Sequence, residues 1–255
     1  GIVDYPGVCE KLGELLRAHG AQIHLSTRVT GIRQTDSQVV VLTTKGDFTG
    51  DLMVNCTGIH SDRLTRMSGT KPTSKIVPFR GEYFELKPEA EHLCRTLIYP
   101  VPDPKFPFLG VHFTKMVLGG VECGPNAVLA FAREGYSKLH INPRDLFESL
   151  TYPGFIRMAA KNWKTGCGEM WRSLSKRAFV KALQRLVPDV RVEHLEVSPP
   201  GIRAQALGRD GKLIDDFVIQ ESRRVVNVGN APSPAATAAL NIGNLIVDRL
   251  SDRLS

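Results

Sequence analysis

The sequence predicts a mixed α/β protein, in which one lobe alternates helices with strands and a second lobe carries a mixed or antiparallel sheet. Three observations support this class. The opening segment, up to Gly58, alternates a helical segment with short β-rich runs. From Ile76 onward the β-like segments become longer and are interrupted by prolines. The 255 residues, 42% of them hydrophobic, suffice for one large core or two smaller ones.

The first lobe is expected to open with a helix after Asp4. The Asp4 side chain can cap this helix, apolar residues recur at helical spacing behind it, and Gly20 can end it. Short strands are expected at residues 23–25, 39–42 and 52–54. This order is typical of the later half of a dinucleotide-binding domain.

The second lobe is expected to contain three strands and one long helix. The strands are predicted at residues 76–86, 109–113 and 128–131. A helix over residues 172–186 carries apolar side chains on one side and Lys and Arg over the rest. Solvation is the simplest role for that basic face, and docking on a membrane surface is the alternative.

The last part of the chain returns to the pattern of the first lobe. Asp210 and Gly211 predict a hairpin turn between residues 204–207 and 213–219. A buried strand over residues 225–228 and a helix that begins near Pro234 complete the predicted elements.

The composition restricts the function classes. The net charge is +7, but the basic residues are dispersed and no nucleic-acid motif accompanies them, so nucleic-acid binding is not favoured. A positive field would equally attract a dianionic small substrate.

The five cysteines are scattered and form no Cys-x-x-Cys, which argues against a disulfide framework and a zinc site and favours a reducing compartment. No apolar run is long enough to span a bilayer. Because the chain begins at Gly1 without Met or a signal peptide, we expect a piece of a longer protein.

Several segments have the character of ligand-binding loops. Ser233 and Pro234 begin a helix of small residues, which indicates either plain helix capping or the close approach of a ligand. A strand that ends on Thr57 and Gly58 also lets a backbone pass close to a ligand, although a simple strand-to-helix turn has the same pattern.

The motifs together resemble a known family. They are RVTGI (28–32), NCTGIHSDRL (55–64), PFRGEYFEL (78–86), the stretch 99–136, GIRAQ (201–205), DGKLIDDF (210–217) and NAPSPAATAALNIG (230–243). Nearly the whole chain resembles the bacterial L-2-hydroxyglutarate dehydrogenases (oxidases), which are FAD enzymes of the D-amino-acid-oxidase superfamily. That family opens with a G-x-G-x-x-G turn for the ADP half of FAD, and this sequence contains none. We therefore expect this chain alone to bind FAD poorly.

The resemblance implies a different function for each lobe. Residues 1–75 and 200–255 would be the remainder of a Rossmann-like FAD-binding lobe, and residues 76–199 a substrate-binding lobe. A helix N-terminus at Ser233 would stabilise negative charge at the pyrimidine edge of the flavin. The implied cofactor contacts are Val29, Thr57, Gly58, Asn230, Ala231, Ser233 and Ala235.

The implied reaction is the oxidation of L-2-hydroxyglutarate to 2-oxoglutarate, with hydride transfer to flavin N5. A base must remove the hydroxyl proton, and His112 in LGVHFT is the implied catalytic residue. Arg80 and Arg203 would bind the two carboxylates, without an assignment of which binds which. Tyr83 and Thr114 would add hydroxyl donors, and no metal ligand is predicted.

Other functions stay open at this point. The chain could belong to another flavin oxidoreductase of the superfamily, of the glycerol-3-phosphate or amino-acid type, or be an inactive fragment of such an enzyme. A basic binding module is a third, less favoured alternative. Oxygen and a quinone are both candidate electron acceptors. We expect a cytoplasmic location, with peripheral contact at the inner membrane as the alternative.

Overall fold

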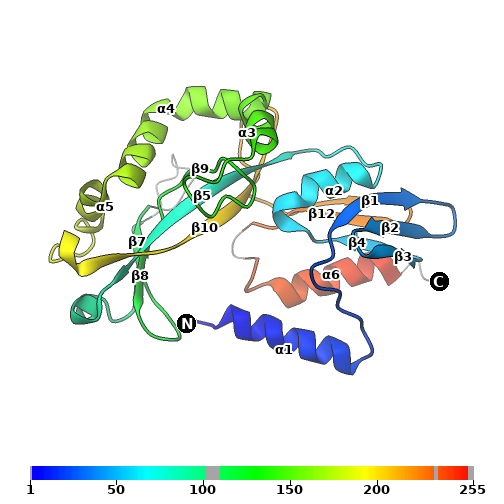
Figure 1. Cartoon of the computed structure of the whole chain (residues 1–255), viewed down its shortest axis with the longest axis horizontal. Helices are drawn as coiled ribbons and strands as arrows, with labels where there is room; N and C mark the ends of the chain where they lie inside the picture. The colour runs from blue at the N-terminus through cyan, green and yellow to red at the C-terminus, as the bar shows by residue number, and fades with distance from the viewer. Residues whose placement is uncertain (1, 102–109, 233–234, 252–255) are drawn as a thin grey trace. The chain divides into compact units, whose positions relative to one another are not determined.

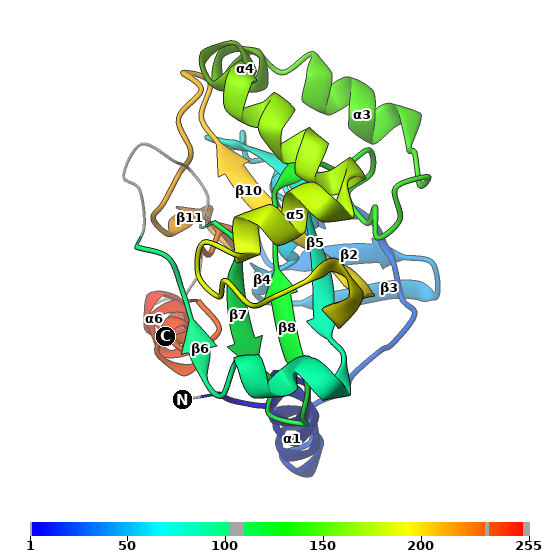
Figure 2. The ribbon, with the colours of Figure 1, turned by 90° about the vertical axis from the view of Figure 1, so that its left-hand side faces the viewer.

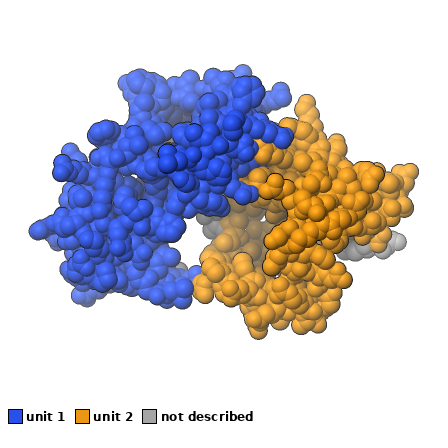
Figure 3. Space-filling model, viewed as in Figure 1, with its two compact units in different colours: residues 1–3, 77–213 blue, residues 4–76, 214–255 orange. Residues whose placement is uncertain are grey.

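The computed structural model describes residues 2–101, 110–232 and 235–251 (Figure 1). The chain divides into two compact units (Figure 3). The first unit contains residues 1–3 and 77–213, and the second contains residues 4–76 and 214–255. The sequence prediction placed the first internal boundary between residues 75 and 76, one residue before the division between residues 76 and 77, and it assigned residues 200–213 to the other lobe. Those residues lie in the first unit because β10 (Leu195–Leu207) runs through them as part of its sheet.

The first unit is built on one six-stranded sheet, whose main path has the order β10-β5-β8-β7-β6. The bounds are β5 (Lys75–Leu86), β6 (Leu97–Ile98), β7 (His112–Lys115), β8 (Val121–Gly124) and β9 (Val128–Leu129), and β9 pairs with β5 outside the main path. The pairs β5–β8, β5–β9, β6–β7 and β7–β8 all run antiparallel. The predicted mixed or antiparallel sheet is thereby confirmed.

Helices cover one face of this sheet (Figure 2). They are α3 (Pro143–Leu150), α4 (Pro153–Leu174) and α5 (Lys176–Leu183). Phe179 and Leu183 of α5 are fully buried in a core with Leu86, Phe113 and Val121 of the strands, and this burial fixes the helix on the sheet.

The single helix expected over residues 172–186 is instead divided at Ser175. Ser175 has an extended backbone, with φ −122° and ψ 104°, and its Oγ accepts a hydrogen bond from the backbone N–H of Ala178. Serine is a favoured helix cap, so it ends α4 and begins α5 although the apolar pattern continues across it.

The second unit contains two three-stranded sheets. The first has the order β11-β12-β4 and comprises β4 (Met53–Asn55), β11 (Val218–Glu221) and β12 (Val225–Asn230). β12 runs parallel to β4 and antiparallel to β11. The second is an antiparallel meander of β1 (Val29–Gln34), β2 (Val39–Thr43) and β3 (Gly46–Gly50).

Helices pack on the sheet that contains β12. In α6 (Ala239–Ser251), Ile246 packs against Val226 and Val228 of β12. The helix α2 (Ser61–Met67) also packs against β12, and α1 (Tyr5–Ala18) precedes the meander (Figure 1). The remaining elements are the 3-10 turns η1 (Gly58–His60), η2 (Pro88–Leu93) and η3 (Val192–His194). No helix in the described ranges is long and apolar enough to cross a membrane.

The local predictions have mixed outcomes. Asp4 caps α1 as expected, since its Oδ1 accepts a hydrogen bond of 3.2 Å from the N–H of Gly7. The strand expected at residues 23–25 is wrong, because this segment forms no strand and the Leu25 side chain is exposed. The Asp210–Gly211 turn is confirmed by the bridge that pairs residues 207 and 213, but β11 begins only at Val218. The last helix begins at Ala239; Pro234 lies outside the described residues.

Candidate active site

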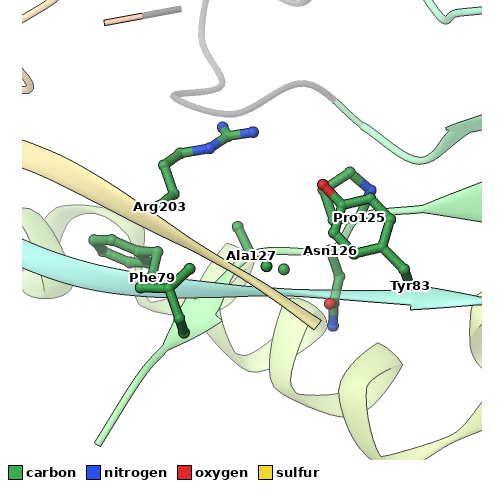
Figure 4. A pocket seen from close by; sticks show the side chains of 9 residues that line it. Phe79, Tyr83, Pro125, Asn126, Ala127 and Arg203 are labelled. Carbon is green, nitrogen blue, oxygen red and sulfur yellow. The ribbon is translucent and has the colours of Figure 1, made fainter. Parts of the chain in front are cut away.

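The first unit contains a hollow of about 200 Å³ beside strands β5 and β10 (Figure 4). Strand β5 contributes Phe79, Gly81 and Tyr83, β10 contributes residues 201–203, and the turn after β8 contributes residues 125–127. Glycine at position 81 is required for this arrangement, because a Cβ there would lie 2.6 Å from the Cβ of Pro125. The hollow therefore depends on a close approach between a strand and a turn.

Arg203 provides the positive charge at the hollow. It lies on β10, is largely exposed, and extends away from the ribbon of its strand (Figure 4). Burial raises the pKa of Tyr83 on β5 and lowers that of His112 on β7; the Arg203 charge opposes the first shift and adds to the second. Arg203, Tyr83 and His112, which the sequence predicted as site residues, are thus electrostatically coupled although they belong to three different strands.

His112 is half-buried at the start of β7. Burial lowers its pKa, the hydrogen bond with the Gly110 carbonyl opposes that effect, and the Arg203 charge lowers the pKa further. The Nδ1 atom lies 3.1 Å from the Gly110 oxygen. A carbonyl can only accept, so Nδ1 donates its proton and Nε2 carries the lone pair in the neutral ring. This is the protonation state that a base requires.

Tyr99 is a residue of this cluster that the sequence did not predict. Its ring stacks on the His112 ring, and its Oη lies 3.2 Å from the Oγ1 of Thr114. It follows β6, a strand of only two residues, whose Leu97 pairs with Thr114. So short a strand has no periodicity to detect, and the only sequence signal was that Tyr99 opens the proline-rich stretch.

The hydroxyl group of Tyr83 stays protonated. Burial raises its pKa, the charge of Glu122 raises it further, Arg203 lowers it, and Tyr99 raises it. A neutral phenol can donate a hydrogen bond to an anionic ligand. Tyr83 also lies against β10, because a Cβ on Gly201 would be 3.4 Å from its Cε2.

A pair of carboxylates lies on the same face of the sheet. Glu122 of β8 is directly opposite Glu85 on β5 and opposite Thr114 on β7, so the three side chains share one face. Burial raises the pKa of Glu122, and the charge of Glu85 raises it further. The sequence prediction missed this pair, because only the strand register brings the two residues together.

Arg80 lies elsewhere. Its side chain is buried, and Nη2 is 3.1 Å from the Oε1 of Glu82 while Nη1 donates to the carbonyl of Ser137 at 3.1 Å. Glu82 also pairs with Lys138 at 3.2 Å and accepts a bond of 2.7 Å from the Oγ of Ser173 in α4. The structure does not bring Arg80 to the hollow, and its guanidinium is held by a carboxylate of the chain itself.

In the second unit, the ends of β4 and β12 bring four predicted cofactor contacts together. Because the two strands are parallel, with Asn55 beside Asn227, their carboxyl ends meet at one edge of the sheet. Thr57 and Gly58 follow β4, while Asn230 ends β12 and Ala231 follows it. The side chain of Asn230 donates to the carbonyls of Ile214 and Asp216, both at 2.9 Å.

The other predicted cofactor contacts belong to other segments of the sequence. Val29 begins β1 in the meander, where it pairs with Thr43. Ala235 lies in a turn, and its N–H donates to the carbonyl of Pro232 at 2.9 Å. Ser233 lies outside the described residues. Within the described parts of the chain, no cluster of His, Cys, Asp and Glu could hold a metal ion.

Comparison with known proteins identifies the family of this chain. Residues 1–249 match the FAD dependent oxidoreductase (DAO) family, and the chain belongs to this family. Among its relatives is L-2-hydroxyglutarate dehydrogenase of Indibacter alkaliphilus, 49% identical over 97% of this chain and 62% of that protein. The enzyme of that name from Escherichia coli K12 is 41% identical over 100% of this chain and 61% of the relative. The human mitochondrial one is 40% identical over 99% and 58%. This chain thus spans about three-fifths of these relatives.

Solved structures agree on the fold. L-alpha-glycerophosphate oxidase from Mycoplasma pneumoniae with FAD bound matches with a TM-score of 0.64 at 20% identity, covering 89% of this chain and 51% of that one. L-amino acid deaminase from Proteus myxofaciens matches with a TM-score of 0.58 at 18% identity, covering 95% and 56%. These structures confirm the predicted fold class, and the family match confirms the predicted family, which is FAD-dependent.

The second unit has features that suit the flavin half of FAD. Gly58 has φ +51°, a left-handed conformation that glycine adopts without strain. A Cβ built on Gly58 would meet no atom within 4 Å, so this turn is open to a neighbouring group. Backbone at the carboxyl edge of parallel strands is where open α/β sheets bind ligands. The residues present therefore fit the flavin side.

Proposed function

We propose that the protein containing this chain oxidises L-2-hydroxyglutarate to 2-oxoglutarate. The observation that carries the proposal is the hollow lined by Arg203 and Tyr83, together with His112, whose register partner Gly124 precedes the lining residue Pro125. This arrangement combines a cation, a hydrogen-bond donor and a neutral base. The relatives named L-2-hydroxyglutarate dehydrogenase support the substrate assignment. FAD, when bound, accepts the hydride that leaves C2 of the substrate.

His112 is the proposed base. In the neutral ring Nε2 takes the proton of the substrate hydroxyl as the C2–H bond breaks, so the alcohol loses a proton and a hydride and becomes a ketone. The hydrogen bond to the Gly110 carbonyl keeps the imidazole in the required tautomer. Burial and the Arg203 charge both disfavour the protonated imidazolium form of His112, so the ring is neutral before the reaction and can accept a proton.

Arg203 is the proposed carboxylate-binding residue. A guanidinium presents a planar pair of donors to a carboxylate, and Arg203 lines the hollow. Tyr83 would donate its hydroxyl proton to the same ligand, and Thr114 would supply a further hydroxyl from β7. Because Arg80 is paired with Glu82, we propose Arg203 alone as the arginine that contacts substrate.

The proposed cofactor contacts are those at the strand ends of the second unit. Thr57, Gly58, Asn230 and Ala231 would contact the flavin, and Val29 and Ala235 are proposed from the family resemblance alone. We propose a small dicarboxylate as substrate and oxygen or a quinone as electron acceptor. Oxygen consumption, compared with reduction of a soluble quinone, distinguishes the acceptors.

An anaerobic flavin titration of the full-length protein tests the proposal. L-2-hydroxyglutarate should bleach the flavin absorbance and yield one 2-oxoglutarate per flavin, while the D-enantiomer should leave the spectrum unchanged. Glycerol 3-phosphate and L-amino acids serve as the panel for the other members of the family. Bleaching by one of these and not by L-2-hydroxyglutarate would overturn the substrate, and a flavin that no substrate bleaches would indicate an inactive protein.

A further inference from the structure

Two buried asparagines occupy equivalent positions on the parallel strands of the second unit. Asn55 of β4 and Asn227 of β12 are register partners, with exposed fractions of 1% and 0%. The amide nitrogen of Asn55 donates to the Oδ1 of Asn227 at 2.9 Å. Buried parallel strands are normally rich in Val, Ile and Leu, so a pair of amides at this position calls for a reason.

The Asn55 amide links the sheet interior to the exposed turn that follows. Its Oδ1 accepts hydrogen bonds from both donors of Thr57, the backbone N–H at 3.2 Å and the hydroxyl at 2.6 Å. Both Thr57 and Gly58 are exposed, while the amide that holds Thr57 is buried. The conformation of the exposed turn at Thr57 and Gly58 is therefore fixed by the buried side chain of Asn55.

The opposite end of the amide is anchored to α2. The Nδ2 of Asn55 lies 3.2 Å from the carbonyl of Ser61, and the Nδ2 of Asn227 donates to the Oγ of Ser68 at 3.2 Å. The Oγ of Ser61 in turn donates to the carbonyl of Gly229 in β12 at 2.9 Å. This network joins β4, β12 and α2, and the two bonds from Thr57 to Asn55 are its connection to the turn.

We propose that Asn55 is a positioning residue for the flavin, which acts by holding Thr57 and Gly58 in the conformation that binds it. The proposal rests on the proposed cofactor contacts of those two residues. Both Thr57 donors are used by Asn55, so Thr57 has only acceptor atoms left for other partners. Asn55 itself makes no cofactor contact in this proposal, and its effect passes entirely through the turn.

The network permits a test that separates positioning from stability. In the double variant Asn55→Val/Asn227→Val, the two amides disappear together, and replacing both partners of a buried hydrogen bond by apolar groups is nearly neutral for stability. The polar groups left behind keep partners: Ser61 O still accepts from Thr65 Oγ1 at 2.7 Å, and Ser68 Oγ still donates to Thr65 O at 2.8 Å. Only Thr57 loses its acceptor, and it is exposed to water.

The matched control is Asn227→Val alone. This variant removes one buried amide but leaves both bonds between Asn55 and Thr57, and Asn55 Nδ2 keeps Ser61 O as an acceptor. The single variant should therefore bind FAD as the unmodified protein does. Thr57→Val is a second probe, because it removes only the hydroxyl bond and leaves the buried sheet unchanged.

The measurement is the affinity of the full-length apoprotein for FAD, monitored by the quenching of flavin fluorescence. Thermal unfolding of each apoprotein is recorded in parallel. We expect affinity about ten-fold weaker in the double variant, because the two hydrogen bonds that order the turn are lost. Thr57→Val should give a smaller loss of FAD affinity, and Asn227→Val none.

Unchanged FAD affinity in the folded double variant would overturn the proposal. If the double variant does not fold, unchanged affinity in Thr57→Val overturns it instead. The readout involves no substrate, so failure of the proposed reaction leaves this result independent.

Discussion

The imidazole ring of His112 lies against the phenol ring of Tyr99, with their centroids 4.3 Å apart and their planes inclined by 19°. Stacking fixes the plane of the imidazole, while the hydrogen bond between Nδ1 and the Gly110 carbonyl fixes its rotation within that plane. Tyr99 and Gly110, which belong to different segments, thus restrict the proposed base to one orientation. A base that is already oriented when substrate binds loses less entropy in the reaction.

Replacement of His112 should slow flavin reduction. In the full-length protein, His112→Ala is expected to lower the rate of reduction by L-2-hydroxyglutarate about 10²–10⁴-fold, with little change in substrate binding, because a general base acts in the transition state. Stopped-flow absorbance of the flavin measures this rate. His92→Ala, at an exposed histidine of the same unit, is the control, and equal rates in all three proteins would refute the assignment.

The pH dependence should follow from the lowered pKa of His112. A base works when deprotonated, so kcat/KM should rise with pH, and the midpoint of this rise should lie below the ordinary histidine pKa of about 6.5. Arg203 contributes to the lowering, so Arg203→Gln should raise the pKa of His112 and move this acid limb to higher pH. The pH profile of flavin reduction tests the sign. A limb that stays in place or moves to lower pH would show that Arg203 does not act on His112.

The two arginines predicted as carboxylate ligands should respond differently. Arg203→Lys keeps the charge but loses the bidentate geometry, and we expect the dissociation constant for 2-oxoglutarate to rise about ten-fold. Isothermal titration on the oxidised protein measures it. An unchanged constant would remove Arg203 from the proposed carboxylate site.

Arg80→Met should instead act on stability. It leaves Glu82 buried without its arginine partner, and breaking such a pair costs about 3–5 kcal/mol. Lys138→Met removes a half-exposed partner of the same carboxylate and should cost far less. Urea unfolding compares the two variants. Equal, small effects would mean that the Arg80–Glu82 pair does not hold the unit together.

Glu122→Gln should strengthen binding of a dianionic ligand. The carboxylate lies on the same face of the sheet as Tyr83 and Thr114, so its negative charge opposes that of the substrate. The variant should lower the dissociation constant of 2-oxoglutarate, whereas Glu196→Gln, at an exposed position on β10, should not. Weaker binding in Glu122→Gln would show that this carboxylate supports the ligand.

The sequence predicted the elements whose side chains follow a regular period, and little beyond them. The strand over residues 76–86 was predicted almost to its ends, since β5 spans Lys75–Leu86. The alternation at Ile23 and Leu25 had the same appearance and failed, because no strand pairs with that segment. Local periodicity reports the intrinsic preference of a segment, whereas a strand also needs a partner that lies elsewhere in the chain.

The candidate site shows the same limit. Family motifs led to His112, Tyr83 and Arg203, and the structure couples their charges. The same motifs gave Arg80 a role that its pairing with Glu82 does not support, because alternation along β5 separates residues 80 and 83 onto different faces. Tyr99 and Glu122 reach the cluster only through the register of β6, β7 and β8, which no short motif encodes.

The parallel pairing of β4 with β12 joins residues 53–55 to residues 225–227, and the chain between them contains all of residues 77–213. During synthesis, that intervening unit leaves the ribosome before β12 exists. It can bury its own core while β4 still lacks the neighbour that completes its sheet. Asn55 and Asn227 therefore meet only after the intervening unit has been synthesised, and the edge proposed for the flavin forms later than the core of that unit.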